Sequence, residues 1–170
     1  MTLAITDACI FIDLYELELS ADFFSLNLEI HTSLDVFNEL YPHQQQLLKA
    51  YQSIGKLIVH NLSMEDRLAI IGSTYPKALS DNDKTVLFLA EKLDAIVISS
   101  DRAVRQFAKT KSIEYHGMLW IFDRLVEVCI ITHVIACEKL KKLIASNLIY
   151  QNNSQLVAEM DRRLKSWSAK

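Results

Sequence analysis

The sequence predicts an α/β protein, a three-layer α/β/α sandwich with a mainly parallel central sheet and a helical C-terminal extension. Residues 95–98 form an apolar, β-branched run without polar alternation, which suits a strand covered on both faces, as in a parallel sheet. Segments with helical periodicity precede and follow this run, as α/β folds require. Asp101 comes just after the run, at the edge where open α/β sheets bind ligands.

The other elements follow from the same two periodicities: short apolar runs are expected as strands, and segments with an apolar residue every three or four positions as helices. The expected elements are, in order, strand 3–5, helix 8–19, strand 26–30, a helix from 34 past 48, strand 56–60, helix 64–75, helix 80–93, strand 95–98, helix 102–108, strand 113–116 and helices 120–130, 135–146 and 154–165. Ser80 and Asp83 have the spacing of a capping box. Pro42 is expected to kink its helix or divide it in two.

Composition predicts one compact domain over residues 1–170, because 51% of the residues are hydrophobic and only 3 are Gly and 2 Pro. The 18 basic and 21 acidic residues give a formal net charge of -3. Binding of nucleic acid would therefore need a local basic patch.

Targeting signals and cysteine usage favour a cytoplasmic protein. The apolar N-terminus lacks a basic start and contains Asp7, and residues 119–137 carry several ionisable groups, so neither a signal peptide nor a membrane span is expected. The three cysteines lack metal-ligand spacing and are expected to be reduced thiols in the core.

Two motifs resemble those of the PIN-domain family of metal-dependent nucleases. Leu79-Ser80-Asp81-Asn82-Asp83 matches the family's L-S-x-x-D at a helix start, and Ser99-Ser100-Asp101 matches the T/S-x-D that ends the next strand. The order strand, Asp7, helix is how the family begins, and Glu39 matches its second acidic segment. The resemblance covers residues 2–130 as the core, and residues 131–170 form the helical extension.

The resemblance implies a Mg²⁺- or Mn²⁺-dependent endoribonuclease with a site of four acids, Asp7, Glu39, Asp83 and Asp101. An all-oxygen site suits these hard cations and not zinc. Two such ions could activate a water and stabilise the leaving 3′-oxygen of a phosphodiester. The remaining implied site residues are the hydroxyl of Ser99, which would orient a carboxylate or a water, and the RNA-phosphate contacts Arg102, Arg105 and Lys109.

Small proteins that resemble this one are often toxins of type II toxin–antitoxin pairs. The resemblance therefore implies an RNA substrate, a cognate antitoxin, commonly a homodimer, and no membrane partner.

Each site residue also has a purely structural explanation. Asp7 fits a helix N-cap and Glu39 a solvated helix face, Asp35 competes for the role of Glu39, and the basic residues after Asp101 suit an exposed helix surface. Asp13 is expected to be solvated. The rival function is a PIN-like module that binds RNA or protein without cleaving it.

Two other α/β families with acidic sites are excluded because the sequence lacks their motif residues. A haloacid-dehalogenase-type phosphatase needs D-x-D after its first strand, where this chain has Asp7, Ala8 and Cys9. A receiver domain needs an early acidic pair and a late lysine at a strand end, and the sequence supplies neither.

Overall fold

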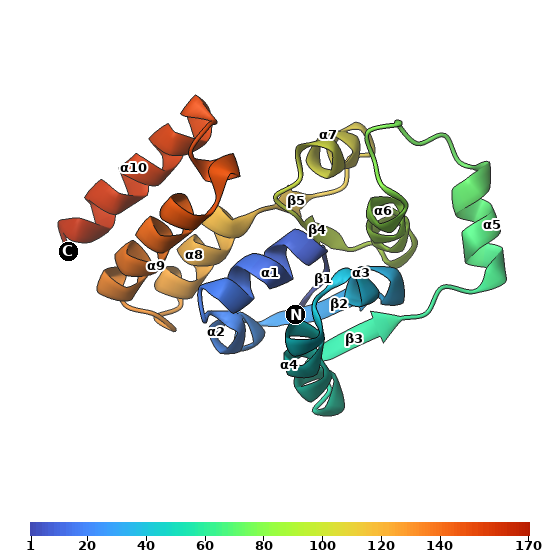
Figure 1. Ribbon diagram of the computed structural model, residues 1–170, viewed down its shortest axis with the longest axis horizontal. Coiled ribbons are helices and arrows are strands. Elements are labelled where there is room, and N and C mark those ends of the chain that lie inside the picture. Colours follow the sequence, from blue (N-terminus) through green and yellow to red (C-terminus); the bar gives the residue numbers. More distant parts are fainter.

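The computed structural model describes residues 1–170 and has one five-stranded sheet in which every pairing is parallel (Figure 1). The strand order is β3-β2-β1-β4-β5. The predicted α/β class, with helices on both faces of a parallel sheet, is confirmed.

The elements lie close to the predicted segments. They are β1 (Thr2–Thr6), α1 (Ala8–Glu16), α2 (Ser20–Phe24), β2 (Leu28–Ser33), α3 (Leu34–Glu39), α4 (Pro42–Ser53), β3 (Leu57–His60), α5 (Met64–Gly72), α6 (Asp81–Leu93), β4 (Ile96–Ile98), α7 (Arg102–Thr110), β5 (Tyr115–His116), α8 (Met118–Glu127), α9 (His133–Ser146), the 3-10 helix η1 (Leu148–Tyr150) and α10 (Ser154–Ser168).

The topological switch point of the sheet, where the strand order reverses, lies between β1 and β4. From β1 the chain steps outward through β2 to β3, then returns past β1 and steps the other way through β4 to β5. Right-handed crossovers therefore place the helices of the two halves on opposite faces. Ala4 pairs with Ile96 and Thr6 with Ile98, so β1 and β4 end level with each other. Side chains that follow these two strands meet at the switch point, where such sheets bind ligands.

The core is a single cluster of 40 buried apolar residues that runs from the strands into the C-terminal helices. Helix α6 packs across β1, β2 and β4, and α1 packs with α2, α3 and α4. β4, with all three residues buried, fits its sequence of Ile96, Val97 and Ile98. The sheet is therefore covered on both faces, as the lack of polar alternation predicts.

Pro42 divides the predicted long helix in two. α3 ends at Glu39, Leu40 is extended with ψ of 153°, and Pro42 is the first residue of α4. Proline is favoured there because its missing N–H has no partner within the helix. Glu39 is thus the last residue of a short helix instead of a position inside a long one.

Two expectations about individual side chains are wrong. Asp13 is only 8% exposed, because α1 turns this position toward the C-terminal extension and not toward solvent. Cys129 is exposed and has a φ of 57°, since it lies in the turn after α8 and not in the core.

The C-terminal extension contains helices α9 and α10, which pack against each other, and α9 packs against α8 of the core (Figure 1). α9 buries Ala136, Leu140 and Leu143, and α10 buries Met160 and Trp167. An ion pair of Arg163 with Asp123, 2.7 Å between Nη2 and Oδ2, joins α10 to α8. None of the helices has the length and apolar character needed to cross a membrane.

Candidate active site

Asp7 is the buried centre of the candidate site. It is 5% exposed and follows β1 directly, where its Oδ1 accepts a hydrogen bond of 2.7 Å from the Ala8 N–H and caps α1. Its own N–H donates to the Ile98 carbonyl at 3.0 Å, which fixes it beside the end of β4. The pKa of Asp7 is raised to about 6, chiefly by burial; the hydrogen bond from Ser99 lowers it, and the negative charge of Asp83 raises it. Keeping Asp7 ionised in this buried position costs free energy, and a nearby cation would remove that cost.

Ser99 connects Asp7 with the start of α7. Its hydroxyl donates to Asp7 Oδ2 at 2.8 Å and accepts a hydrogen bond of 3.1 Å from the Asp101 N–H. The side chain is fully buried. One hydroxyl thus bonds both a carboxylate, as the resemblance implies, and the backbone N–H of Asp101.

Asp101 lies at the exposed side of this network. It is the N-cap of α7, with Oδ1 accepting a 3.0 Å hydrogen bond from the Val104 N–H. Its Oδ2 has no hydrogen-bond partner within the protein. One carboxylate oxygen thus caps the helix while the other faces solvent.

Asp83 and Glu39 approach from α6 and α3. The capping box that the sequence predicts is formed, with Asp83 Oδ2 accepting from the Ser80 N–H at 2.7 Å and Ser80 Oγ from the Asp83 N–H at 3.1 Å. Asn82 donates from Nδ2 to Glu39 Oε2 at 2.9 Å, which ties the end of α3 to the first turn of α6. The negative charge of Asp83 raises the pKa of Asp7, so the start of α6, which carries Asp83, lies near the end of β1.

Asp35 points into a different interaction. Both of its carboxylate oxygens are bound by Arg67 of α5 at 3.1 Å. A bidentate pair of this kind satisfies the carboxylate. Asp81 is likewise paired with Lys84, at 2.8 Å. Asp35 and Asp81 thus each have a cationic partner, whereas Glu39 has none.

None of the four predicted acids forms an ion pair with a lysine, arginine or histidine. Asp83, Asp101 and Glu39 each keep one carboxylate oxygen free of protein hydrogen bonds. This donor set fits a hard divalent cation. No three His, Cys, Asp or Glu side chains lie close enough to form a complete protein cage for an ion. Mg²⁺ needs no such cage, because it keeps several waters and takes one or two carboxylates together with substrate phosphates.

The predicted basic contacts on α7 have different surroundings. Arg102 and Lys109 are exposed, whereas Arg105 is half-buried, with its guanidinium 5.3 Å from the centre of the Tyr115 ring. Lys109 is in the last turn of α7, away from the Asp101 end. Arg105 is therefore the one of the three that lines a cavity.

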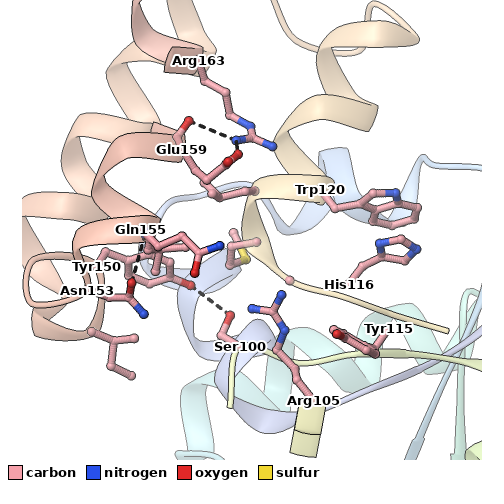
Figure 2. A pocket seen from close by; sticks show the side chains of 15 residues that line it. Ser100, Arg105, Tyr115, His116, Trp120, Tyr150, Asn153, Gln155, Glu159 and Arg163 are labelled. Carbon is pink, nitrogen blue, oxygen red and sulfur yellow. Dashed lines mark hydrogen bonds and ion pairs between the residues drawn. The ribbon is translucent and has the colours of Figure 1, made fainter. Parts of the chain in front are cut away.

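Sequence reasoning missed a polar network that reaches the site from the C-terminal extension. Tyr150 Oη donates to Asp13 Oδ2 at 3.3 Å and lies 2.9 Å from Ser100 Oγ, and Asn147 donates to Asp13 Oδ1 at 3.3 Å. Figure 2 shows the bond between Tyr150 and Ser100. Burial raises the pKa of Asp13 to about 6, and the bonds from Asn147 and Tyr150 lower it. An acid among the apolar positions of α1 was the available signal, but its partners lie more than 130 residues away.

Comparison with known proteins supports the resemblance. A family model described as a PIN domain matches residues 3–165, which includes most of the C-terminal extension. Among solved structures, a PilT N-terminus domain protein, SSO1118 from the hyperthermophilic archaeon Sulfolobus solfataricus P2, has a similar fold, with a TM-score of 0.52 and 15% identity over 74% of this chain and 95% of that chain. No curated protein matches the chain. The match to the family model covers nearly the whole sequence, and the chain therefore belongs to the PIN-domain family, whose fold is of the nuclease type.

Proposed function

We propose that the chain is a Mg²⁺- or Mn²⁺-dependent endoribonuclease whose site consists of Asp7, Glu39, Asp83 and Asp101. The observation that carries this proposal is the state of Asp7, a buried carboxylate with a pKa of about 6, with Asp83 as a second negative charge and no cation nearby. Negative groups gathered without compensation at a sheet switch point are typical of a functional site and not of a structural one.

In this proposal the role of each acidic residue follows from its exposure to solvent. Asp7, fixed by Ser99 and by the Ala8 N–H, is the rigid ligand, while Asp101 and Glu39 line the solvent side from which RNA would approach. A bound divalent cation would polarise the phosphodiester and lower the pKa of the attacking water. Ser99 orients Asp7, and Arg102, Arg105 and Lys109 on α7 supply positive charge for RNA phosphates.

Cleavage of a fluorescently labelled single-stranded RNA tests the proposal. The wild-type chain should cut it with Mn²⁺ or Mg²⁺ and stop in chelator. Asp101→Asn should reduce the rate by at least about a hundredfold, because it removes a central charged group. Asp35→Asn is the matched control: its partner is Arg67, it lies outside the site, and cleavage should persist. Equal rates for Asp101→Asn and wild type, or cleavage that survives the chelator, would refute the assignment.

The rival, a PIN module that binds without cutting, predicts RNA binding in every metal condition and no product in any of them. The environment of Glu39 is the observation that supports this non-cleaving module. Its side chain is exposed and already bonded to Asn82, as a residue without a metal ligand's role would be. Binding and cleavage measured on the same RNA separate the two functions.

We further propose that the nuclease is the toxin of a type II toxin–antitoxin pair and acts as a homodimer. A small neighbouring reading frame that encodes a DNA-binding protein, and growth arrest that co-expression of that protein relieves, are the expected results. Growth arrest that depends on Asp101 would tie toxicity to cleavage. Expression without any effect on growth would instead indicate general RNA processing. Sedimentation velocity should give the mass of two chains.

A further inference from the structure

A cavity of about 380 Å³ lies between the carboxyl end of β5 and the start of α10 (Figure 2). Its walls come from the core and from the C-terminal extension together. The core supplies Ser100, Arg105, Tyr115 and Trp120, and α10 supplies Gln155. Because Ser100 immediately precedes Asp101, one wall of the cavity is continuous with the candidate active site.

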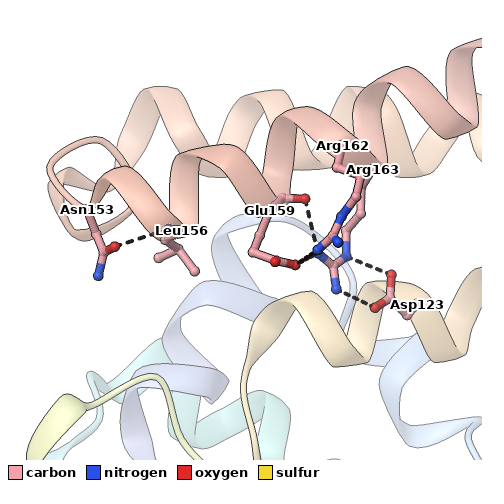
Figure 3. Close-up of polar contacts among 6 residues, drawn as sticks. All are labelled: Asp123, Asn153, Leu156, Glu159, Arg162 and Arg163. Carbon is pink, nitrogen blue, oxygen red and sulfur yellow. Dashed lines mark hydrogen bonds and ion pairs between the residues drawn. The ribbon is translucent and has the colours of Figure 1, made fainter.

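Arg105 is the uncompensated charge in this cavity. Its guanidinium forms no ion pair and no hydrogen bond with the protein, although it is half-buried over Tyr115. The other arginine in the wall is fully occupied: Arg163 binds Asp123 at 2.7 Å and Glu159 at 3.1 Å (Figure 3). Glu159 is also paired with Arg162, so this acid adds no free negative charge. Arg105 is therefore the one arginine in the cavity wall without a carboxylate partner.

The wall beside Arg105 is aromatic. The rings of His116 and Trp120 stack with centroids 4.3 Å apart and an interplanar angle of 13°, and Tyr115 lies under the guanidinium. Flat aromatic walls next to an arginine are what single-stranded nucleic acids use, because bases stack on the rings while the cation binds a phosphate. Tyr115 and His116 belong to β5 and Trp120 to α8, so the wall is formed where the last strand meets the helix that follows it.

The opposite wall carries side-chain amides. Gln155 in the first turn of α10 makes no side-chain hydrogen bond within the protein, and in Figure 2 it extends into the cavity toward the side of Arg105. Asn153 caps α10 through Oδ1, which accepts from the Leu156 N–H at 3.1 Å, and keeps its Nδ2 free. Amides can both donate and accept, as the edge of a base requires.

We propose that this cavity binds one unpaired nucleotide of the RNA substrate, with its phosphate on Arg105 and its base against the aromatic wall of Tyr115, His116 and Trp120. The inference rests on the proposed function, because it takes RNA as the substrate. The volume is at the lower end for small-molecule sites, which leaves room for one nucleotide and excludes a duplex. The C-terminal extension then has a direct role, since α10 closes the cavity.

The test uses nucleoside 5′-monophosphates and needs no cleavage. The chain has two tryptophans, Trp120 in the cavity and Trp167, which is 8% exposed and packs near Phe122. In a Trp167→Phe background, fluorescence therefore reports on Trp120. Titration with AMP, CMP, GMP and UMP should quench this emission, and adenosine or inorganic phosphate alone should bind at least about tenfold more weakly.

Arg105→Gln should weaken mononucleotide binding by about tenfold or more, as expected for loss of a charge-assisted contact. Arg124→Gln is the matched control, because Arg124 lies on α8, pairs with Glu127 and does not line the cavity. Equal melting temperatures show that both variants fold, and calorimetric titration on the unmodified sequence checks the fluorescence result independently.

The two proposals fail separately. If RNA is cleaved with dependence on Asp101 but mononucleotides do not quench Trp120, or Arg105→Gln binds as wild type does, the cavity is not a nucleotide site and the nuclease function stands. If mononucleotides bind through Arg105 but no metal supports cleavage, the cavity assignment stands and the nuclease function fails.

Discussion

Replacing Asp7 with Asn should stabilise the metal-free protein at pH 8. The folded-state pKa of Asp7 is raised from 3.8 to about 6. A raised carboxyl pKa means that the native state binds more protons than the unfolded state between these values, so stability falls as pH rises from 3.8 to 6 and stays lower above. At about 1.4 kcal/mol per pKa unit, the ionised carboxylate costs about 3 kcal/mol at pH 8.

Asn keeps the cap but cannot accept hydrogen bonds from Ala8 and Ser99 with both of its terminal atoms. One hydrogen bond contributes about 1 kcal/mol, so the expected net gain at pH 8 is about 2 kcal/mol. The lost bond costs the same at every pH, whereas the charge penalty almost disappears at pH 4. The stability difference between variant and wild type should therefore shift by the change in the charge penalty alone, about 2 to 3 kcal/mol between pH 4 and pH 8.

Urea unfolding in chelator at pH 4 and pH 8, followed by circular dichroism, measures this shift. Asp94→Asn supplies the baseline, because Asp94 is exposed and its φ of 50° is one that Asn also adopts. A difference that is the same at both pH values, or a loss of stability at pH 8 in Asp7→Asn, would show that Asp7 is an ordinary helix cap.

Three further predictions concern the metal and the C-terminal extension. Mn²⁺ should raise the melting temperature of the wild type and raise it less in Asp83→Asn, because only the native state holds Asp83 near Asp7; equal shifts would place the ion elsewhere. Tyr150→Phe should destabilise the protein by about 1 to 3 kcal/mol above pH 6, because it removes a donor to ionised Asp13, and by less at pH 4; urea unfolding at both pH values measures this. Truncation before His133 should abolish cooperative thermal unfolding, because it exposes the α8 surface covered by α9; a soluble, cooperatively folded product would contradict self-packing.

The sheet and the acidic ends of its strands could be predicted because both depend on local sequence. The run Ile96-Val97-Ile98 has no polar alternation, and the capping box of Ser80 and Asp83 is encoded within four residues. The strand and the capping box both depend only on residues that are close together in the sequence. The division at Pro42 was anticipated for the same reason, since the cause lies in one residue's missing N–H.

The partners of buried polar groups could not be predicted, because they come from distant segments. Asp13 looks like a solvated acid until Asn147 and Tyr150 are placed beside it. In the sequence Asp35 competes with Glu39 for one role, and the position of Arg67 on α5 shows that Asp35 is the paired one of the two. Long-range pairing, and not local propensity, decides which carboxylates stay free to act.

The C-terminal extension is bonded to residues beside the candidate site and is not an addition to a finished domain. Tyr150 bonds both Asp13 in α1 and Ser100, the residue before Asp101. The two helices that begin at the carboxyl edge of the sheet, α1 at Asp7 and α7 at Asp101, are thus linked a second time through the extension. The family model continues through residue 165, across this linkage. A chain that ended after α8 would lose Asn147 and Tyr150, the two hydrogen-bond donors to Asp13, and with them the link between α1 and Ser100.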